Sequence, residues 1–497
     1  MFAEGPRKFI ASDLQIRDPW FAVCALLAAT LLGPGARIAE AQDADPGGAG
    51  LVADLTTALG RTYENNPGLA ASRADQRAVD EEIPQAKADW FRPTISGKAD
   101  GNYTLYRQSQ GASSRGREAA PVREDIFEPS LSGNLSFPIF RGGSTLNGLR
   151  AAEASVAAGS NNLAGTEQSL LGATATGYAN VAYYQTLVGI NREEIKKGYA
   201  PLAKMLETMV RSRTSTVTDL AQVHVQLASA RADLESNIAE LATATETFER
   251  LVGAPPGELD PKVQFSIGAT GLDAAIEIGL AENPGLLAAR ADVESSRFEV
   301  AKLKGALLPD LSLQALVDQE WEKLRYVDDE NKRISDSDRT STFGAVASIP
   351  IYEGGARYSE IRQQRQELAA AQANLQYVQR ETRVGVRSGW QQYRAYQREL
   401  AAYDKAIQAG RVAVEGKLKE FRNGTTSTQE VLISRENLFD AMEAQAYAQL
   451  QQTTSLVQLL TAMGRFDAKS LELPVTLYDP GKYLDEVRDR WIGYEID

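Results

Sequence analysis

The sequence predicts an α+β fold that is mostly α and is built from a tandem-duplicated long-helix unit. Landmarks recur in the same order at a shift of 211–217 residues, long proline-free stretches are rich in Ala, Gln, Glu and Arg, and shorter runs alternate in polarity. Self-similarity at a fixed period indicates a repeated structural unit, and alternating polarity indicates strands. We therefore divide the 497-residue chain into a signal peptide (1–41), repeat 1 (51–266), repeat 2 (267–475) and a C-terminal tail (476–497).

The first 41 residues have the pattern of an export signal. Basic residues precede an apolar run from Trp20 to Leu32, and Ala39-Glu40-Ala41 offers a small-x-small cleavage site. This order is typical of a secretory signal peptide, and the run is shorter than the ~20 residues of a membrane-spanning helix. A buried core helix is the alternative. Cys24, the single cysteine, lies within the run, so we expect a mature chain without disulfides.

The composition excludes several classes of function. With 53 basic and 66 acidic residues, the net charge of −13 argues against a nucleic-acid partner. One Cys and one His argue against a structural metal site, a Cys/His nucleophile pair or an iron–sulfur cluster. His224 stands alone on a predicted helix, where a solvated or core-edge side chain is the better interpretation. We expect no catalytic residue, no metal and no cofactor.

The repeat is defined by four pairs of landmarks. They are Asn66-Pro67-Gly68-Leu69 with Asn283-Pro284-Gly285-Leu286, residues 136–143 with 348–355, residues 211–220 with 422–431, and Gly253 with Gly464. In each repeat the first landmark opens a helix, predicted over 67–91 and 284–308. Because four pairs keep one order at a nearly constant shift, we infer a duplicated unit.

A β-hairpin is predicted after the first helix of each repeat. The alternating runs lie near 95–105 and 131–137, and near 310–318 and 341–349, each about 10 residues long, which matches transmembrane β-strands. The connections 107–128 and 321–339 are polar. The acidic stretch 328–338 is predicted to be a solvated surface loop, with attraction of cations as the alternative.

The second half of each repeat is predicted to be a helical hairpin. Long helices over 142–211 and 355–422 lead to polar turns at 212–218 and 423–428, and shorter helices follow over 219–252 and 429–463. The two shorter helices of each repeat together match the length of a long one, so we expect them to stack end to end beside it. The predicted strand-to-helix hinges are Pro138, Gly142, Gly143, Pro350, Gly354 and Gly355. A phosphate-loop interpretation of Gly142-Gly143-Ser144 fails because the GxxxxGK[ST] pattern is absent.

These elements predict an oligomeric conduit. No stretch of the mature chain suits a membrane-spanning helix, so we expect β-strands to cross the membrane. Four strands cannot close a barrel, because the smallest stable barrels have about eight. Three copies contribute 3 × 4 = 12 strands, which predicts a trimeric α-helical barrel with a 12-stranded transmembrane β-barrel, four strands per protomer. The modest hydrophobicity of the long helices favours a wide tube with a polar interior.

Over roughly residues 51–475 the chain resembles the TolC-type outer-membrane channel family. The resemblance rests on the Asn-Pro-Gly-Leu openings, the strand exits 137–143 and 349–355, and the turn Phe421-Arg-Asn-Gly424 followed by Glu430-Val-Leu. It implies a homotrimer in the outer membrane of a Gram-negative bacterium that extends into the periplasm. It also implies a periplasmic adaptor and an inner-membrane ABC or proton-driven pump as partners, with drugs or secreted proteins as cargo. The tail resembles members that serve type I protein secretion.

The resemblance assigns roles to the two helix–turn–helix tips. Asp219 and Glu430 fall on the acid positions of the periplasmic entrance, and Arg213, Thr214, Thr216, Gly424, Thr425 and Ser427 form the adaptor-docking tips. Arg213 stands where a glycine is expected, and Ile433 where some members carry a second acid. The alternative is that both acids are first-turn residues favoured by the helix dipole, with Thr216 and Ser427 as caps.

Other functional classes explain less of the sequence. A non-conducting coiled-coil scaffold or adaptor of the cell envelope would account for the helices, but not for paired alternating strands at the same place in both repeats. A secreted hydrolase needs a concave nucleophile or carboxylate site, and no motif of that kind is present. We therefore expect a passive export duct.

Overall fold

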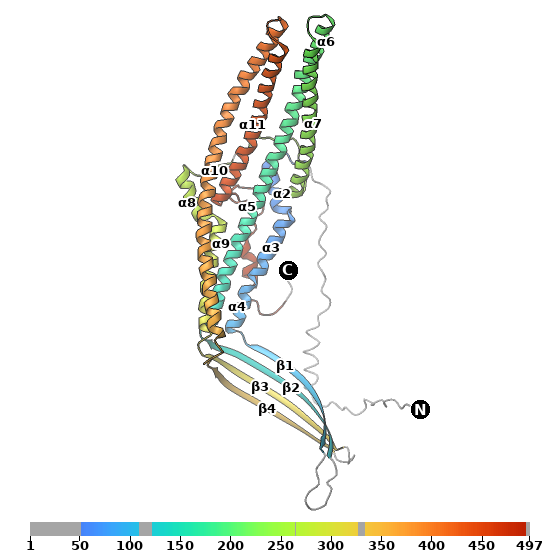
Figure 1. Ribbon diagram of the computed structural model, residues 1–497. Helices are drawn as coiled ribbons and strands as arrows, with labels where there is room; N and C mark the ends of the chain where they lie inside the picture. The colour runs from blue at the N-terminus through green and yellow to red at the C-terminus, as the bar shows by residue number, and fades with distance from the viewer. Residues whose placement is uncertain (1–50, 109–121, 264, 327–332, 494–497) are drawn as a thin grey trace, which may run out of the picture. The chain divides into compact units, whose positions relative to one another are not determined.

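A computed structural model describes residues 51–108, 122–263, 265–326 and 333–493. The predicted signal peptide (1–41) lies outside the described residues, and so do the central parts of the two predicted strand connections. The structure is mostly helical, with the strands gathered at one end of the helices (Figure 1). Among the described residues, no helix combines the length and the apolar character needed to cross a membrane.

The elements follow one order twice. The first series is α2 (Leu55–Asn65), α3 (Pro67–Asp80), α4 (Glu82–Phe91), β1 (Thr94–Gln108), β2 (Val122–Arg141), α5 (Ser144–Glu193), the π-helical turn η1 (Glu194–Tyr199), α6 (Ala200–Arg211) and α7 (Val217–Val252). The second is α8 (Leu272–Glu282), α9 (Pro284–Gly305), β3 (Asp310–Tyr326), β4 (Arg333–Ser348), α10 (Ala356–Arg422) and α11 (Thr428–Met463), after which α12 (Pro480–Val487) lies in the tail.

Within the described residues, the strands form one four-stranded antiparallel sheet in the order β1-β2-β3-β4. The register aligns Ile95, Leu135, Ala315 and Phe343 in one row across the strands. Directly opposed residues point to the same face of a sheet, so this face is apolar. The neighbouring row, Thr94–Ser136–Gln314–Gly344, lies on the opposite face, which is rich in small and polar residues.

The strands are longer than the sequence predicted. Residues 122–128, 321–326 and 333–339, which we expected in loops, belong to β2, β3 and β4. Asp336 and Asp338 are therefore strand residues, paired with Glu322 and Glu320, while 328–332 lies outside the described residues. The prediction was wrong here because a hairpin ladder pairs backbone groups whatever the polarity of the side chains.

Two proline effects change the predicted helices. The predicted helix 67–91 is divided at Glu81 into α3 and α4, because Pro84 cannot donate to the carbonyl of Asp80. The helix predicted over 142–211 is interrupted by η1, where Ala200 N donates to Ile195 O. Pro201 follows at once and lacks an N–H. The helices α2 and α8 were not predicted.

The π turn explains a detail of the repeat. The shift between the repeats is 212 residues at the strand exits and 211 at the tips, so repeat 1 has one additional residue between these landmarks. A π turn, with bonds five residues apart, accommodates one more residue than an α turn. The corresponding helix α10 runs without interruption from Ala356 to Arg422.

The Asn-Pro-Gly-Leu motifs join helices end to end. Asn66 caps α3 by accepting from Gly68 N, and its side-chain amide donates to Leu251 O in the last turn of α7 at 2.9 Å. Asn283 caps α9 by accepting from Leu286 N, and its amide donates to Ala462 O in α11 at 3.1 Å. One side chain thus satisfies groups at two helix termini. The predicted stacking is confirmed, with α9 and α11 at different levels along α10 (Figure 1).

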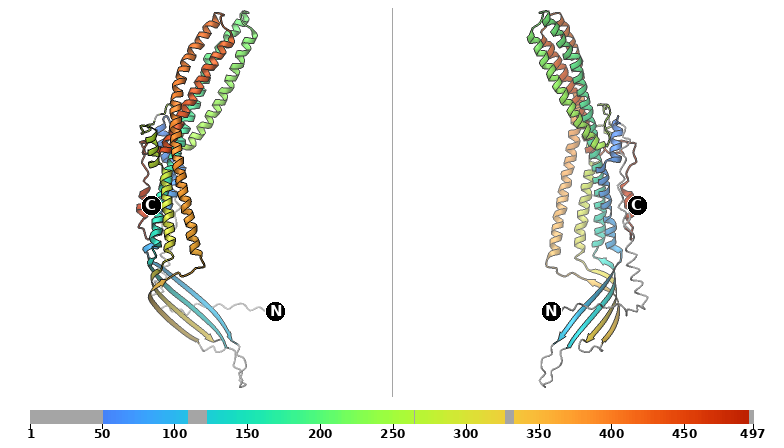
Figure 2. Two further views of the ribbon diagram at one scale, coloured as in Figure 1. Left: turned by 60° about the vertical axis from the view of Figure 1, so that its left-hand side comes forward. Right: turned by 90° about the vertical axis from the view of Figure 1, so that its right-hand side faces the viewer.

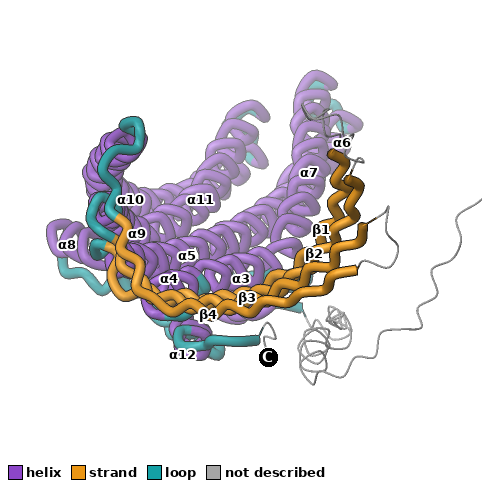
Figure 3. Tube along the Cα trace, turned by 90° about the horizontal axis from the view of Figure 1, so that it is seen from below, coloured by secondary structure: helices purple, strands orange, loops and turns teal. Residues whose placement is uncertain are grey.

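The two helical hairpins lie side by side at the end opposite the sheet (Figures 1 and 2). Seen along the helices, the strands and helices form a curved layer, and α12 lies on its convex side (Figure 3). A large apolar core joins α2, α5, α7 and α11 in the middle of the helices. A second apolar core lies near the tips. These cores hold the two repeats together along their length.

Candidate functional site

The two tips have the same backbone conformation. Thr214 N donates to Met209 O at 2.8 Å, and Thr425 N donates to Glu420 O at 3.0 Å, so both helices end in the same hydrogen-bonded turn. The turn requires a left-handed residue, which is Gly424 (φ 75°) in one tip and Arg213 (φ 59°) in the other. Arginine at this position costs about 1–2 kcal/mol relative to glycine. The sequence departure at Arg213 therefore leaves the turn unchanged.

Asp219 belongs to a capping box at the start of α7. Its amide donates to Thr216 Oγ1 at 3.1 Å, and its carboxylate accepts from Thr216 N at 3.1 Å and from Ser215 Oγ at 3.1 Å. The hydrogen bond from the Thr216 hydroxyl is the main cause that lowers the pKa of Asp219, and bonds from Ser215 and Thr428 also contribute. Asp219 is therefore ionised and held at the N-terminus of α7, where the helix dipole favours a negative charge.

Glu430 is placed differently. Ser427 caps α11 by accepting from Glu430 N at 3.3 Å, while the Glu430 carboxylate lies 3.9 Å from Lys417 Nζ on α10. The Glu430 side chain keeps about half of its surface exposed (54%). The alternative from the sequence is thus correct in that Thr216 and Ser427 are the caps of α7 and α11. Of the two acids, Glu430 is the more accessible to solvent.

An apolar core brings the two tips together. Leu206 and Val223 of the first hairpin share it with Phe421 and Val431 of the second. Thr428, buried at the start of α11, also reaches the Asp219 carboxylate from the other hairpin. The side chains of Arg213, Thr214, Thr216, Thr425 and Ser427 and the backbone of Gly424 remain exposed. The tips therefore form one surface supported by a shared core.

A buried ion pair near the tips was not predicted. Arg435 Nη1 of α11 lies 2.9 Å from Glu194 Oε1 of η1, and these side chains are only 10% and 17% exposed. Burial raises the pKa of Glu194 although Arg435 opposes the shift, and burial together with Glu194 raises the pKa of Tyr199 to about 12. The partners are 241 residues apart in sequence, so the sequence alone did not reveal that they meet. The one-residue change in the repeat shift was the only sequence signal of the irregular turn η1.

The strand-exit glycines adopt the conformation expected of a sharp turn. Gly142, Gly143, Gly354 and Gly355 all have φ between 61° and 85°. Gly142 also contacts α9 so closely that a Cβ atom would overlap Gly305 O, whereas a Cβ at Gly354 would meet no atom within 4 Å. The register between β2 and β3 shifts next to Pro138, while Pro350 follows the end of β4.

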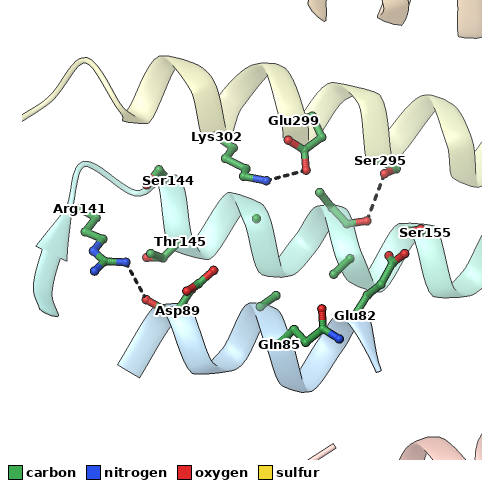
Figure 4. A pocket seen from close by; sticks show the side chains of 14 residues that line it. Glu82, Gln85, Asp89, Arg141, Ser144, Thr145, Ser155, Ser295, Glu299 and Lys302 are labelled. Carbon is green, nitrogen blue, oxygen red and sulfur yellow. Dashed lines mark hydrogen bonds and ion pairs between the residues drawn. The ribbon is translucent and has the colours of Figure 1, made fainter. Parts of the chain in front are cut away.

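A pocket of about 460 Å³ lies beside the first strand exit, between α4, α5 and α9 (Figure 4). Its basic groups have partners in the protein: Lys302 Nζ lies 3.0 Å from Glu299 Oε1, and Arg141 Nη1 donates to Asp89 O at 3.4 Å. Within the described ranges, no cluster of His, Cys, Asp and Glu could hold a metal ion. The pocket lies at the junction between the sheet and the helices.

Comparison with known proteins agrees with this architecture. The profile of the family "outer membrane efflux protein" matches residues 58–254 and 275–465. The outer membrane efflux protein BepC of Brucella suis is 30% identical over 453 residues, which cover 90% of this chain and 93% of BepC. The alkaline protease secretion protein AprF of Pseudomonas aeruginosa is 25% identical over 65% of this chain and 67% of AprF. The solved outer membrane channel CmeC of Campylobacter jejuni has a TM-score of 0.70 at 17% identity, over 88% of this chain and 89% of CmeC, which shows a common fold.

Proposed function

Because the chain belongs to the outer membrane efflux protein family, we propose that three copies assemble into one export duct. The protein is an outer-membrane efflux channel. The number of copies, the cargo and the partner proteins are proposals. BepC is an efflux protein and AprF serves protease secretion, so the cargo of this duct is small molecules or secreted proteins, selected by the pump. We assign no catalytic residue and no cofactor.

The open sheet is the observation that carries the trimer. Within the described residues, β1 and β4 each have a strand neighbour on one side only. Backbone groups without partners are costly in lipid, and four strands are too few to close a cylinder. Pairing β4 of one copy with β1 of the next closes a cylinder of 3 × 4 = 12 strands.

The internal repeat predicts how neighbouring copies meet. Inside the chain, α5 of repeat 1 packs on α9 of repeat 2, where Ser295 Oγ donates to Ala151 O at 3.2 Å. By the repeat shifts, α10 is equivalent to α5, and α3–α4 is equivalent to α9. The α10 helix of one copy is therefore expected to pack on α3–α4 of the next. Gln363 then takes the place of Ala151 and Ala78 that of Ser295, and both are exposed in the single chain.

Crosslinking tests this interface. The mature chain has no cysteine if the predicted signal peptide that contains Cys24 is removed. A short bifunctional maleimide is expected to link Gln363→Cys/Ala78→Cys into dimers and trimers in outer membranes, and each single variant is expected to stay unlinked. Arg362→Cys/Ala78→Cys is the matched control, because residue 362 lies on a different face of α10. Equal linkage of both pairs, or none in folded protein, contradicts the interface.

We place adaptor docking on the exposed tip residues Arg213, Thr214, Thr216, Gly424, Thr425 and Ser427. Three features support this: the tips lie at the end opposite the sheet, both turns have the same hydrogen bonds, and a common apolar core supports them. The adaptor connects the duct to an inner-membrane pump, either an ABC or a proton-driven one. The pump supplies the energy, since the sequence has no phosphate-loop motif.

Single-channel recording in a planar bilayer tests the duct itself. Purified protein extracted from outer membranes is expected to produce stable current steps of uniform size. The duct is contradicted if folded, membrane-extracted oligomers of both the wild type and the Asp219→Asn/Glu430→Gln variant carry no current. That outcome favours the alternative, a non-conducting envelope scaffold.

Asp219 and Glu430 are proposed as entrance acids. Asp219→Asn with Glu430→Gln removes two charges per copy, and the asparagine side chain keeps an oxygen that can accept from Thr216. Multivalent cations are therefore expected to block the double variant less strongly than the wild type, with Glu430 contributing more because it is more exposed. Glu367→Gln, an exposed acid near the sheet end of α10, is the matched control. Equal block in the wild type and the double variant contradicts this assignment.

A further inference from the structure

The C-terminal tail is the part of the chain that the channel function leaves unexplained. Its helix α12 places Leu484 against an apolar cluster that includes Ile83 and Leu149. Next to it, Tyr483 Oη donates to Glu81 Oε1 at 2.8 Å. These contacts fasten the tail along α3 and α4, on the convex side of the curved layer (Figure 3).

Beyond α12 the tail reaches the beginning of the sheet. Lys87 Nζ of α4 lies 2.6 Å from Asp489 Oδ1. Arg92 lies between α4 and β1, and its Nη1 donates to Arg490 O at 2.7 Å. The Arg92 guanidinium also lies over the ring of Trp491, with 4.9 Å between Cζ and the ring centre. Three contacts therefore hold this end of the tail at the boundary between helices and strands.

The apolar side chains at this boundary are left uncovered by the chain itself. Trp491 is 65% exposed and Ile492 is 91% exposed. At the start of β1, Ile95 on the apolar face of the sheet is also 78% exposed. Tryptophan is enriched where membrane meets water, and arginine can extend its charge to the aqueous side of that boundary. The pair of Trp491 and Arg92 has this amphipathic character.

We propose that the tail is a surface anchor that inserts Trp491 and Ile492 into the phospholipid headgroup layer on the periplasmic side of the outer membrane. This inference rests on the proposed placement of the sheet in that membrane. In a ring of copies the convex side of the layer faces outward, so the tail meets lipid and not the duct interior. Arg92 and Arg490 lie beside the anchor, where phosphate groups can pair with basic side chains.

Tryptophan fluorescence tests the anchor in the complete mature protein. Besides Trp20 in the predicted signal peptide, the chain contains Trp90, Trp321, Trp390 and Trp491, so changing three of these four to Phe isolates each one. The proteins are reconstituted in phosphatidylethanolamine and phosphatidylcholine vesicles, with or without bromine on the acyl chains near the headgroups. Trp321 reports on the sheet, because it lies on the apolar face. Trp390 lies in an apolar cluster of the helical region and is the negative control.

Brominated lipid is expected to reduce Trp491 emission about twofold, as for an interfacial tryptophan, and aqueous iodide is expected to have little effect. Arg92→Gln in the same background removes the guanidinium that holds Trp491 and is expected to make Trp491 accessible to quenching by iodide.

Quenching of Trp321 but not of Trp491 by brominated lipid overturns the anchor and leaves the duct intact. Protection of Trp491 from both quenchers also overturns it, because a second copy or another protein then covers the tail. Absence of lipid quenching at Trp321 overturns the membrane placement of the sheet, and the anchor with it.

Discussion

A glycine at the end of α11 offers a sharp test of the end-to-end helix junctions. Gly464 has φ 79° and its equivalent Gly253, at the end of α7, has φ 75°. Replacing either by alanine puts a Cβ atom on a left-handed residue, at a cost of about 1–2 kcal/mol. Only Gly464 adds a clash, since its Cβ would lie 2.6 Å from the carbonyl carbon of Glu282 and 2.9 Å from the Cα of Asn283.

The clash sets the expected difference between the two variants. The neighbours of Gly464 are backbone atoms of Glu282, which ends α8, and of Asn283, which caps α9, and they cannot rotate away as a side chain can. Forced overpacking of this kind costs about 1–3 kcal/mol. We therefore expect Gly464→Ala to lower the free energy of unfolding by about 2–5 kcal/mol, and Gly253→Ala by about 1–2 kcal/mol.

Urea unfolding in detergent, followed by far-ultraviolet circular dichroism, measures both values. Gly253→Ala is the matched control, because both glycines end a helix within one chain beside an Asn-Pro motif, and a Cβ at Gly253 would meet no atom within 4 Å. Equal destabilisation by the two substitutions would show that the close approach of α11 to the α8–α9 junction does not contribute to stability.

Two further predictions concern partly buried carboxylates in the helical hairpins. Arg435→Met leaves the Glu194 carboxylate buried without its partner and is expected to lower the free energy of unfolding by about 3–5 kcal/mol. Adding Glu194→Met is expected to recover most of this loss. Equal urea midpoints for the single and double variants would contradict this. Burial raises the pKa of Glu443, opposed by a hydrogen bond from Asn191 and reinforced by Asp233 and Asp440. The folded state therefore binds a proton at Glu443 more tightly than the unfolded state does. The free energy of unfolding of the wild type is expected to fall, relative to that of Glu443→Gln, as the pH rises through this raised pKa. Urea midpoints that change in parallel with pH in the two proteins would refute this.

Local chemistry explains why much of the tips could be predicted from sequence. Thr216 and Ser427 are caps because a short hydroxyl side chain reaches an amide three residues on. Gly424 ends its helix because glycine tolerates a left-handed backbone. Such signals act over a few residues, so they can be recognised without knowledge of the fold.

The strand ends were less predictable. The alternation that marks Ile95 to Leu105 weakens toward the outer ends, yet the ladder there continues through polar pairs such as Glu320 with Asp338. Pairing depends on a partner strand, and side-chain polarity alone does not reveal it. The same limit applies to the helix irregularities at Pro84 and Pro201. Both prolines are visible in the sequence, but their effect on the helix depends on which carbonyl loses its hydrogen-bond donor.

The sequence by itself determined the duplicated unit, the order of its long helices and hairpins and the position of both turns, because periodicity and capping are local properties. Only the tertiary structure decided which distant groups meet. Glu194 and Arg435 are 241 residues apart, Asn66 bridges two helix ends, and the tail reaches Arg92 from the far end of the chain. Such contacts arise when helices pack, and the energy of a contact depends on separation in space and not along the chain.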